Sequence, residues 1–395
     1  MKSAHRLNNT PIEVPRGLTN VVVTETRLSD VRGQEGFYHY RQYSAVDLAR
    51  SRSVEDVWHL LLDGDLPTTD QRASFAAEIA SASRLGRTVS DALPLIAAAT
   101  TRADSLAGLR VAMALQGASA GLRPLLDLTR EERRRDLIGL AALAPTVIAA
   151  QHRIQHGHAP VESRPELGYV ANYLYMLTGR VASPDVVEAL SAYLVAAIDH
   201  GFSASTFTSR VIASTGADAA SCLVGALGAL SGPLHGGAPS RALDTLDEIG
   251  STDNIDTFVM SRLQAGERIM GFGHPVYRTE DPRSTLLKQV AQRFGGARVD
   301  FAVAVEERIP VLLEKFKPGR QLHTNLEWDA AVVMELCGLD RELFTPTFAV
   351  ARLLGWSANV LEQADDSKII RPSARYVGPA APQPVPSETD ARSAA

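Results

Sequence analysis

Apolar residues recur at three- and four-residue spacing along most of this chain, a period that only a helix can place on one face. Many of these segments open with Ser, Asp or Pro and close at glycine, as helices do. They predict helices over residues 53–63, 89–99, 106–115, 131–150, 166–177, 184–200, 218–230, 239–249, 253–265, 284–294, 299–316, 328–337 and 344–363. Strand-like alternation is scarce, and residues 20–26 and 36–40 are expected to form one short hairpin. The sequence therefore predicts a mainly α fold.

Composition narrows the class of protein further. The chain has 395 residues, of which 45% are hydrophobic, and a net charge of −5, which favours a soluble enzyme and points to no nucleic acid and no membrane surface as partner. Its N-terminus lacks the apolar core of a signal peptide, and the weakly polar run 137–150 is too short to span a bilayer. Cys222 and Cys337 lie in apolar stretches, so two free thiols and a cytoplasmic location are expected.

Three loops, at residues 231–238, 271–282 and 317–327, contain most of the unusual chemistry. The first reads Ser-Gly-Pro-Leu-His-Gly-Gly, and the glycines around His235 let a substrate approach the backbone. A histidine beside such a turn can donate a hydrogen bond to a developing negative charge. A tight turn with an incidental histidine explains the same residues equally well.

The second and third loops add anion-binding and acid–base groups. Residues 269–283 combine glycines with His274, Arg278 and Arg283, and exposed N–H groups and guanidinium forks both favour phosphate or carboxylate. As a glycine-rich motif alone this segment is weak evidence, because it neither follows a strand nor matches a Walker loop. In the third loop Glu327 precedes an apolar helix, either as an ordinary helix-start charge or as a general base.

Taken together, these loops resemble the citrate synthase family, whose corresponding segments read GPLHGG, GFGHxVY…DPR and PNVDFYSG. The family's FTPxFAxAR…GW helix is matched here by residues 344–356. Further matching motifs lie at Gly17-Leu-Thr-Asn, Tyr40-Arg-Gln-Tyr, Val57-Trp-His-Leu, Ala171-Asn-Tyr-Leu-Tyr and Ala204-Ser-Thr-Phe. The resemblance runs in the expected order from about residue 17 to residue 378.

The resemblance implies a two-domain citrate synthase-like fold. Residues 1–232 would form a large helical domain and residues 233–339 a small domain, with residues 340–378 returning to the large one. Residues 379–395, rich in Pro, Ala and Ser, are expected to be a disordered tail. It also implies a homodimer with shared active sites between the lobes. Because the match begins near residue 17, no room is expected for the N-terminal β domain of NADH-regulated hexameric relatives.

The implied reaction is the condensation of acetyl-CoA, as a substrate, with oxaloacetate to citrate and CoA, without a metal or a cofactor. By motif, His235 would stabilise the enol or enolate of acetyl-CoA, and His274 would polarise the 2-oxo carbonyl and protonate the new alkoxide. Glu327 takes the place of the family's aspartate, which removes the methyl proton. A carboxylate is a far weaker base than the carbanion it creates, so donors aimed at the enolate oxygen are needed.

The resemblance also assigns the binding residues. The oxaloacetate carboxylates would be bound by Arg283 and Arg352, together with Arg371 from the partner subunit. His200 would make a further contact with the same substrate. The CoA phosphates would be bound by Arg278 and Arg320. Taken alone, any of these arginines could form a surface ion pair, and His200 could be a satisfied histidine at a helix end.

Several positions depart from the family pattern. Glu327 adds one methylene to the base, and a displacement of about 1 Å can cost on the order of a hundredfold in rate. Gly201 and Ser203 stand where the family has Glu and Asn, and Thr324 stands where proline is common. These departures leave open which 2-oxo acid and which acyl-CoA are used.

Two other functions stay open on the sequence. A 2-methylcitrate synthase would accept propionyl-CoA, and one methyl group changes binding by only about 1–3 kcal/mol. A catalytically quiet relative could bind CoA or carboxylates as a regulator, although the retained histidines, carboxylate and arginines argue against it. The histidines at 152, 156 and 158 have a spacing that a metal could use, but with no acidic partner nearby they are expected to mark a helix end.

Overall fold

The computed structural model of the chain describes residues 11–233, 235, 238–267, 269–273, 276–316, 318–319, 322–366 and 368–385. Two predicted site residues, His274 and Arg320, lie outside the described residues. The chain forms two compact units. One runs from Thr26 to Lys368, and the other comprises the two terminal segments, Met1–Glu25 and Ile369–Ala395. The second unit contains the exposed Arg371.

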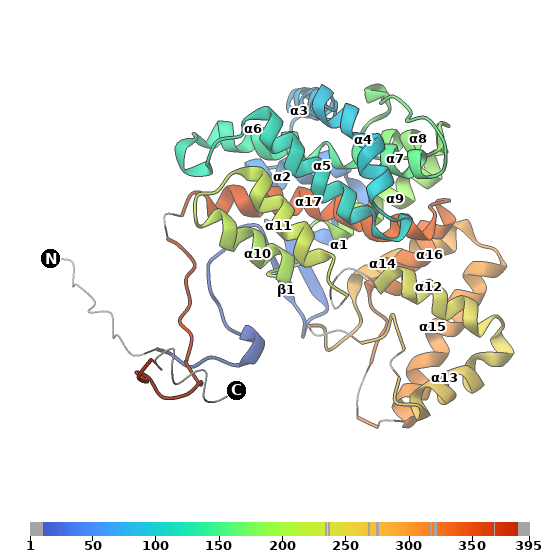
Figure 1. Cartoon of the computed structure of the whole chain (residues 1–395). Coiled ribbons are helices and arrows are strands. Elements are labelled where there is room, and N and C mark those ends of the chain that lie inside the picture. Colours follow the sequence, from blue (N-terminus) through green and yellow to red (C-terminus); the bar gives the residue numbers. More distant parts are fainter. Residues whose placement is uncertain are drawn as a thin grey trace, which may run out of the picture. The chain divides into compact units, whose positions relative to one another are not determined.

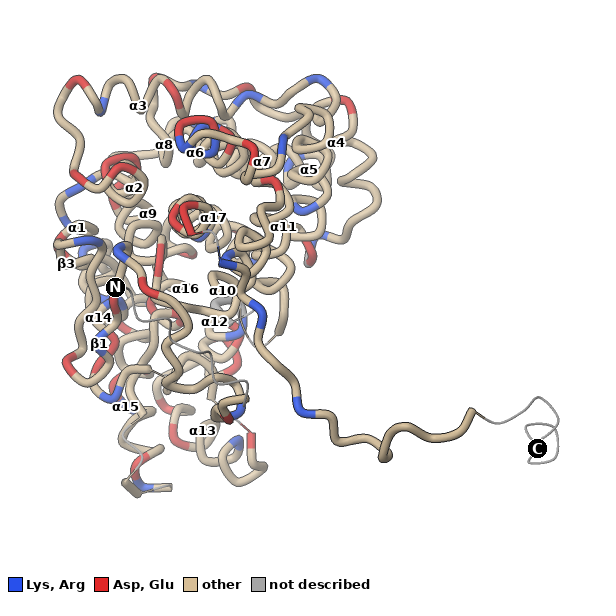
Figure 2. Tube along the Cα trace, turned by 90° about the vertical axis from the view of Figure 1, so that its left-hand side faces the viewer, with Lys and Arg blue, Asp and Glu red and all other residues tan. Residues whose placement is uncertain are grey.

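The described residues form seventeen α-helices, which confirms the mainly α prediction (Figure 1). In chain order they are α1 (Ala45–Ser51), α2 (Val54–Asp63), α3 (Thr69–Ala82), α4 (Arg87–Ala99), α5 (Ser105–Ala120), α6 (Arg130–Ala141), α7 (Ala144–Gln155), α8 (Tyr169–Thr178), α9 (Pro184–Ala197), α10 (Ala204–Ala213), α11 (Ala219–Leu230), α12 (Ala238–Ile249), α13 (Ile255–Gln264), α14 (Pro282–Phe294), α15 (Ala297–Phe316), α16 (Leu326–Leu336) and α17 (Phe344–Gln363). Figure 2 shows acidic and basic residues interspersed along the outer helices α3 and α6.

Three helices were not predicted. In α3 only Phe75 and Ile79 are buried, so its apolar period is faint. The helix α10 is rich in Ser and Thr, which favour caps and turns, and α1 is only seven residues long. The predicted helix 131–150 is instead two helices, α6 and α7, and Pro145 lies in the first turn of α7, where its missing N–H costs no hydrogen bond.

A small antiparallel sheet is the one region where the predicted pairing is wrong. Its strands are β1 (Ser29–Arg32), β2 (Phe37–Tyr40) and β3 (Tyr43–Ser44), in the order β1-β2-β3. The predicted segment 36–40 is indeed a strand, but it pairs with β1 and β3 and not with residues 20–26. A short turn with Gly36 at φ 61° reverses the chain directly between β1 and β2. Residues 20–26 are not joined to β2 by this turn.

The helix α17 forms the centre of the core and is buried along almost its whole length. It packs against α2, α6, α9, α10 and α11 (Figure 1). At Gly355 an added Cβ would lie 2.1 Å from the carbonyl oxygen of Ile198, so only glycine permits this approach to the end of α9. The segment Arg130–Gln155 is apolar and long enough to cross a membrane, but 72% of its most apolar window is buried within the protein.

The helices α12 to α16 form a second group. The helix α16 packs on α12 and α14, α15 packs on α13 and α14, and contacts from α14 and α16 to α9 join the group to the rest of Thr26–Lys368. These helices fall within the predicted small domain, residues 233–339. The boundaries of that domain stay a prediction.

Candidate functional site

The second and third loops of the sequence meet through a short backbone ladder. Phe272 and Thr324 form an isolated antiparallel bridge, and the N–H of Gly273 donates to the carbonyl of His323 at 2.7 Å. Gly271 has φ 85°, and an added Cβ there would lie 3.0 Å from the indole of Trp328. Glycine is therefore required for the glycine-rich loop to lie against the start of α16.

Glu327 lies in the first turn of α16 and is partly buried. Asn325 caps this helix: its Oδ1 accepts the N–H of Glu327 at 3.0 Å, and its Nδ2 donates to the carbonyl of Gly273 at 2.9 Å. Burial raises the pKa of Glu327 to about 7, against the opposing effect of Arg283. A carboxyl with this pKa is ionised in about half the molecules near neutral pH, which suits a general base.

Asp281 links the beginnings of α14 and α16. Its carboxylate accepts from Arg283 Nε at 2.9 Å and Nη2 at 2.7 Å, and Asp281 Oδ2 also accepts the N–H of Leu326 at 3.1 Å. Burial by itself would lower the pKa of Arg283, but the Asp281 carboxylate raises it above its ordinary value. The charged guanidinium is thus held beside the residue that precedes Glu327.

His235 follows α11 and is held by a side chain from α10. Its Nε2 lies 2.7 Å from Oγ of the buried Ser205, and its own N–H donates to the carbonyl of Gly232 at 2.9 Å. Burial and then the charge of Arg352 lower the pKa of His235, which favours the neutral imidazole. A neutral imidazole can donate one hydrogen bond to an oxyanion without adding a buried charge.

Two of the positions that depart from the family pattern have local structural roles. Ser203 caps α10 by accepting the N–H of Thr206 at 3.3 Å, and its Oγ lies 3.2 Å from that of Ser205. Gly201 adopts φ 64°, a left-handed conformation that a glutamate would occupy only with strain. This stretch therefore supports the side chain that holds His235.

Arg352 projects from α17 and is 4% exposed. Its Nε and Nη1 have no hydrogen-bond partner within the described part of the protein, and its guanidinium lies 4.7 Å from the centre of the Phe348 ring. Burial lowers its pKa, which the nearby Asp199 carboxylate opposes. Donors left unpaired inside a protein are costly, so an anionic ligand with carboxylate oxygens would stabilise this side chain.

His200 is connected to Arg283 through an aromatic side chain. Its Nε2 lies 2.9 Å from the hydroxyl of Tyr277, and its ring meets that of Tyr38 edge-on at 5.7 Å. The Arg283 guanidinium in turn lies 5.7 Å from the centre of the Tyr277 ring. The predicted substrate histidine therefore lies within one network with a predicted substrate arginine.

A cavity of about 920 Å³ opens beside the second and third loops. Its lining residues are Tyr277, Arg278, Thr279, Asp281, Pro310, Glu314, Gly319, Leu322, His323 and Thr324. Arg278 is exposed, and its N–H donates at 3.0 Å to Gly33 O, in the turn between β1 and β2. A cavity of this size can hold a large organic ligand.

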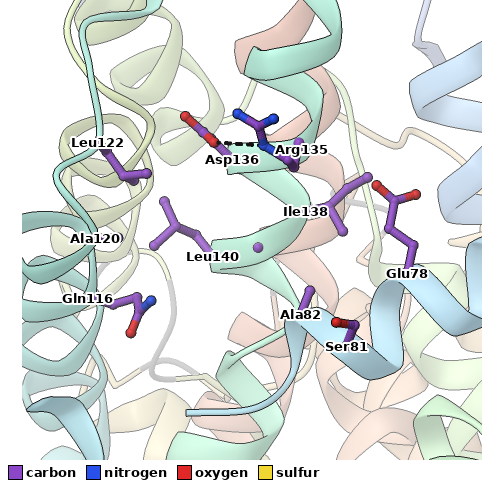
Figure 3. Close-up of a pocket in the computed structure, with 11 residues that line it drawn as sticks. Glu78, Ser81, Ala82, Gln116, Ala120, Leu122, Arg135, Asp136, Ile138 and Leu140 are labelled. Carbon is purple, nitrogen blue, oxygen red and sulfur yellow. Dashed lines mark ion pairs between the residues drawn. The ribbon is translucent and has the colours of Figure 1, made fainter. Parts of the chain in front are cut away.

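A second cavity, of about 510 Å³, lies between α3, α5 and α6 (Figure 3). Apolar side chains such as Leu122, Ile138 and Leu140 line it, and Arg135 and Asp136 form an ion pair of 3.6 Å at its edge. None of the described residues that the sequence assigned to catalysis or binding is among its lining residues.

Several of the predicted residues thus lie close enough to change one another's pKa. The charge of Arg352 lowers the pKa of His235, and the charge of Arg283 lowers the pKa of Glu327 and of Arg352. Arg278 lines the larger cavity, whereas Arg371 belongs to the other unit. The sequence reasoning did not identify Asp281, Asp199, Ser205 or Tyr277. Asp281 had a signal, since an Asp before Pro at a helix start is a common cap.

The comparisons with known proteins agree with one another. Residues 17–373 match the protein family described as "Citrate synthase, C-terminal domain". The chain is 37% identical to the citrate synthase of Haloferax volcanii, over 93% of this chain and 96% of the relative. It is 34% identical to the 2-methylcitrate synthase of Mycobacterium tuberculosis (strain Erdman), over 93% of this chain and 91% of the relative.

Solved structures give the same result. The structure of a citrate synthase from Thermoplasma acidophilum, in a ternary complex with carboxymethyl coenzyme A and oxaloacetate, matches with a TM-score of 0.86 and 27% identity, covering 95% of this chain and 98% of that one. The citrate synthase of Thermotoga maritima matches with a TM-score of 0.80 and 32% identity, over 95% and 98% of the two chains.

Proposed function

This chain belongs to the citrate synthase family and has its fold, and from this premise we propose that it condenses acetyl-CoA with oxaloacetate and water to citrate and CoA. The observation that carries the proposal is the combination of a carboxyl with a pKa of about 7 at Glu327 with the buried guanidinium groups of Arg283 and Arg352. The reaction requires a base whose pKa lies near neutral pH, together with hydrogen-bond donors that bind carboxylates.

The first step is removal of a methyl proton from acetyl-CoA. The Glu327 carboxylate takes the proton, the C–H electron pair forms the new C=C bond, and the C=O pair moves to the former thioester carbonyl oxygen, which gives an enolate. His235, neutral and held by Ser205, donates a hydrogen bond to that oxygen as the negative charge develops. The enolate would form slowly without this donor, since Glu327 is a weak base.

The second step joins the enolate carbon to the 2-oxo carbon of oxaloacetate. We assign to His274, from the motif, the proton that neutralises the new alkoxide. Arg352 and Arg283, with Arg371 from the partner subunit, would hold the two carboxylates, and His200 would contact the same substrate. Water then cleaves the thioester of the product and releases citrate and CoA. These steps use side chains alone, with acetyl-CoA as a substrate.

The coenzyme would lie in the cavity of about 920 Å³ that Arg278 lines. A guanidinium at the rim favours phosphate, and Arg320 is proposed as a second contact. The position of this cavity beside the loop that leads to Glu327 supports the assignment, because the thioester must reach the base.

We also propose a homodimer and a cytoplasmic location. The adjacent helices α4 and α5 expose large apolar side chains, with Leu95 73% and Val111 51% exposed, which supports a subunit interface. Two free and buried thiols, Cys222 and Cys337, support a reducing compartment. The division into a large and a small domain, with the site between them, belongs to the same proposal.

A second candidate is 2-methylcitrate synthesis from propionyl-CoA. It is favoured by the relative of that name, whose 34% identity is close to the 37% of the citrate synthase relative. A pocket distinguishes one methyl group by only about 1–3 kcal/mol, so both acyl groups can be used by one enzyme at different rates.

The deciding experiment measures release of the CoA thiol with acetyl-CoA or propionyl-CoA against a panel of 2-oxo acids. We expect oxaloacetate with acetyl-CoA to give the highest kcat/KM. A higher value with propionyl-CoA would establish the second candidate instead. If folded protein that still binds CoA released no thiol with any pair, the remaining explanation would be a catalytically inactive relative that binds CoA or carboxylates as a regulator. The Glu327→Gln variant serves as the inactive control.

A further inference from the structure

The end of α7 brings two histidines against a carboxylate that is distant in sequence. His152 Nδ1 lies 3.0 Å from Oε1 of Glu342, and His156 Nε2 lies 3.5 Å from the same oxygen. Glu342 belongs to a 3₁₀ turn, η6 (Arg341–Leu343), 190 residues further along the chain. The expectation that these histidines have no acidic partner is therefore wrong, because the fold supplies one.

All three side chains are largely shielded from solvent. His152 is 13%, His156 28% and Glu342 21% exposed at the side chain. One ligand atom from each can be chosen so that the three atoms lie within 4.8 Å of one another. The two histidines are four residues apart on one helix face, with ring centres 4.3 Å apart. One nitrogen of each ring therefore faces the Glu342 carboxylate.

Two neutral histidines carry one ring hydrogen each, which is too few to donate to every oxygen that their ring nitrogens face. His156 Nδ1 lies 2.8 Å from the carbonyl oxygen of His152 and must carry the ring hydrogen, which leaves a lone pair on the Nε2 that faces Glu342. His152 has Glu342 at one ring nitrogen and Asp340 Oδ2 at the other, 3.3 Å from Nε2. A neutral His152 carries a single ring hydrogen and can donate to only one of these two carboxylates.

We propose that His152 Nδ1, His156 Nε2 and the Glu342 carboxylate bind a divalent transition-metal ion of the Zn²⁺ class. Two ligand atoms about 2.0–2.1 Å from tetrahedral zinc lie about 3.4 Å apart. The observed separations of 3.0 and 3.5 Å from Glu342 Oε1 lie close to this value. A water molecule would complete the four ligands.

The outer contacts match those of metal-bound histidines. With His152 bound through Nδ1, its Nε2–H donates to the carboxylate of Asp340, and with His156 bound through Nε2, its Nδ1–H donates to a backbone carbonyl. Such partners fix the tautomer and the ring orientation in known metal sites. The ion would link α7 to η6, the turn that leads into α17. It takes no part in the proposed condensation, and the two proposals stand independently.

The test uses the full-length chain without a histidine tag, freed of metal with a chelator. Zn²⁺ binding is measured by competition with a chromophoric chelator, and Co²⁺ is used as a spectroscopic probe. We expect His156→Ala and Glu342→Gln each to weaken Zn²⁺ binding at least tenfold and to remove the visible Co²⁺ bands of a four-coordinate site. His158→Ala is the matched control, because His158 is exposed in the same turn and should bind as the wild type does.

Two further variants separate this site from other histidines and from unfolding. Asp340→Asn changes an exposed partner of His152 and should weaken binding while keeping the stoichiometry. His235→Ala should keep the ion, because His235 belongs to the condensation site. Zn²⁺ should raise the Tm of the wild type and of His235→Ala, but not that of Glu342→Gln. Equal Zn²⁺ affinity and stoichiometry in the wild type, His156→Ala and Glu342→Gln would overturn the proposal.

Discussion

The titration of Glu327 should control the pH dependence of the reaction. Burial places its pKa at about 7, and the base must be ionised to accept a proton. We expect kcat/KM for acetyl-CoA to fall about tenfold per pH unit below pH 7. The measurement is a pH–rate profile of the wild type at saturating oxaloacetate. A profile that stays flat down to pH 5 would contradict the assignment of Glu327 as the base.

Substitution of the same residue tests its chemistry directly. Glu327→Gln should abolish exchange of the acetyl-CoA methyl protons with solvent, since the amide cannot accept a proton. Glu327→Asp should retain measurable exchange, because a carboxylate remains although its reach is shorter by one methylene. Exchange is followed by NMR in deuterated buffer. Full exchange in the Gln variant would point to another base, such as the buried Asp329.

The raised pKa of Glu327 also has a consequence for stability. The folded state holds this proton up to a pH of about 7 and the unfolded state only to about 4.5. The carboxyl of the unfolded chain therefore ionises first, and stability falls as the pH rises from about 4.5 to about 7. We expect Glu327→Gln to be more stable than the wild type by about 2–3 kcal/mol at pH 8 and by less than about 1 kcal/mol at pH 5. Urea unfolding at both pH values measures the difference.

Glu162→Gln, at an exposed position, is the control for this prediction. It should change stability equally little at both pH values. A Glu327→Gln variant that is less stable than the wild type at pH 8 would mean that the charged carboxylate has a favourable partner in the folded protein.

At the scale of an element, the capping of α16 decides where the base lies. Asn325→Ala removes both the cap of the Glu327 N–H and the bond to the Gly273 carbonyl. We expect a loss of stability of about 1–2 kcal/mol and a fall in kcat that is larger than the change in KM. Ser53→Ala removes a comparable cap, from the N–H of Asp56, on the distant α2. It should cost similar stability and leave kcat unchanged.

The close approach of α17 to the end of α9 gives a second prediction at this scale. In Gly355→Ala the new Cβ would overlap the carbonyl of Ile198, 2.1 Å away, and the backbone of a core helix must move. We expect a loss of about 2–4 kcal/mol, measured by chemical unfolding. Gly139→Ala, on α6, where no atom outside the neighbouring turns of the same helix lies within 4 Å of the new Cβ, should be neutral or slightly stabilising. Equal stabilities of the two variants would contradict this packing.

At the scale of the whole molecule, the proposed dimer shares its active sites through Arg371. Co-expression of Arg371→Ala with His235→Ala produces mixed dimers in which one site has an intact His235 and an intact Arg371 from the partner. Random mixing makes about half the dimers mixed, so about a quarter of all sites should recover activity. Glu327→Gln with His235→Ala is the control, since two residues of one chain's site cannot complement. No recovery, with mixed dimers confirmed by mass, would mean that Arg371 serves its own subunit.

The sequence alone determined the helical class, most helix positions and the family, because helical period, caps and the order of the loop motifs are local properties of the chain. Local patterns also identified His235, Glu327 and Arg283 as candidates, and the family resemblance added Arg352. They misplaced the first strand, since strand pairing depends on a partner and not on the segment itself, and they merged α6 with α7.

Tertiary structure decided the environment of each candidate. The pKa of Glu327 depends on burial and on Arg283, and the neutral state of His235 depends on burial and on Arg352, which is distant along the chain. The meeting of His152 and His156 with Glu342 likewise depends on α7 packing beside the turn before α17. Desolvation and charge act through space, so the chemistry of a side chain is decided only when the fold has chosen its neighbours.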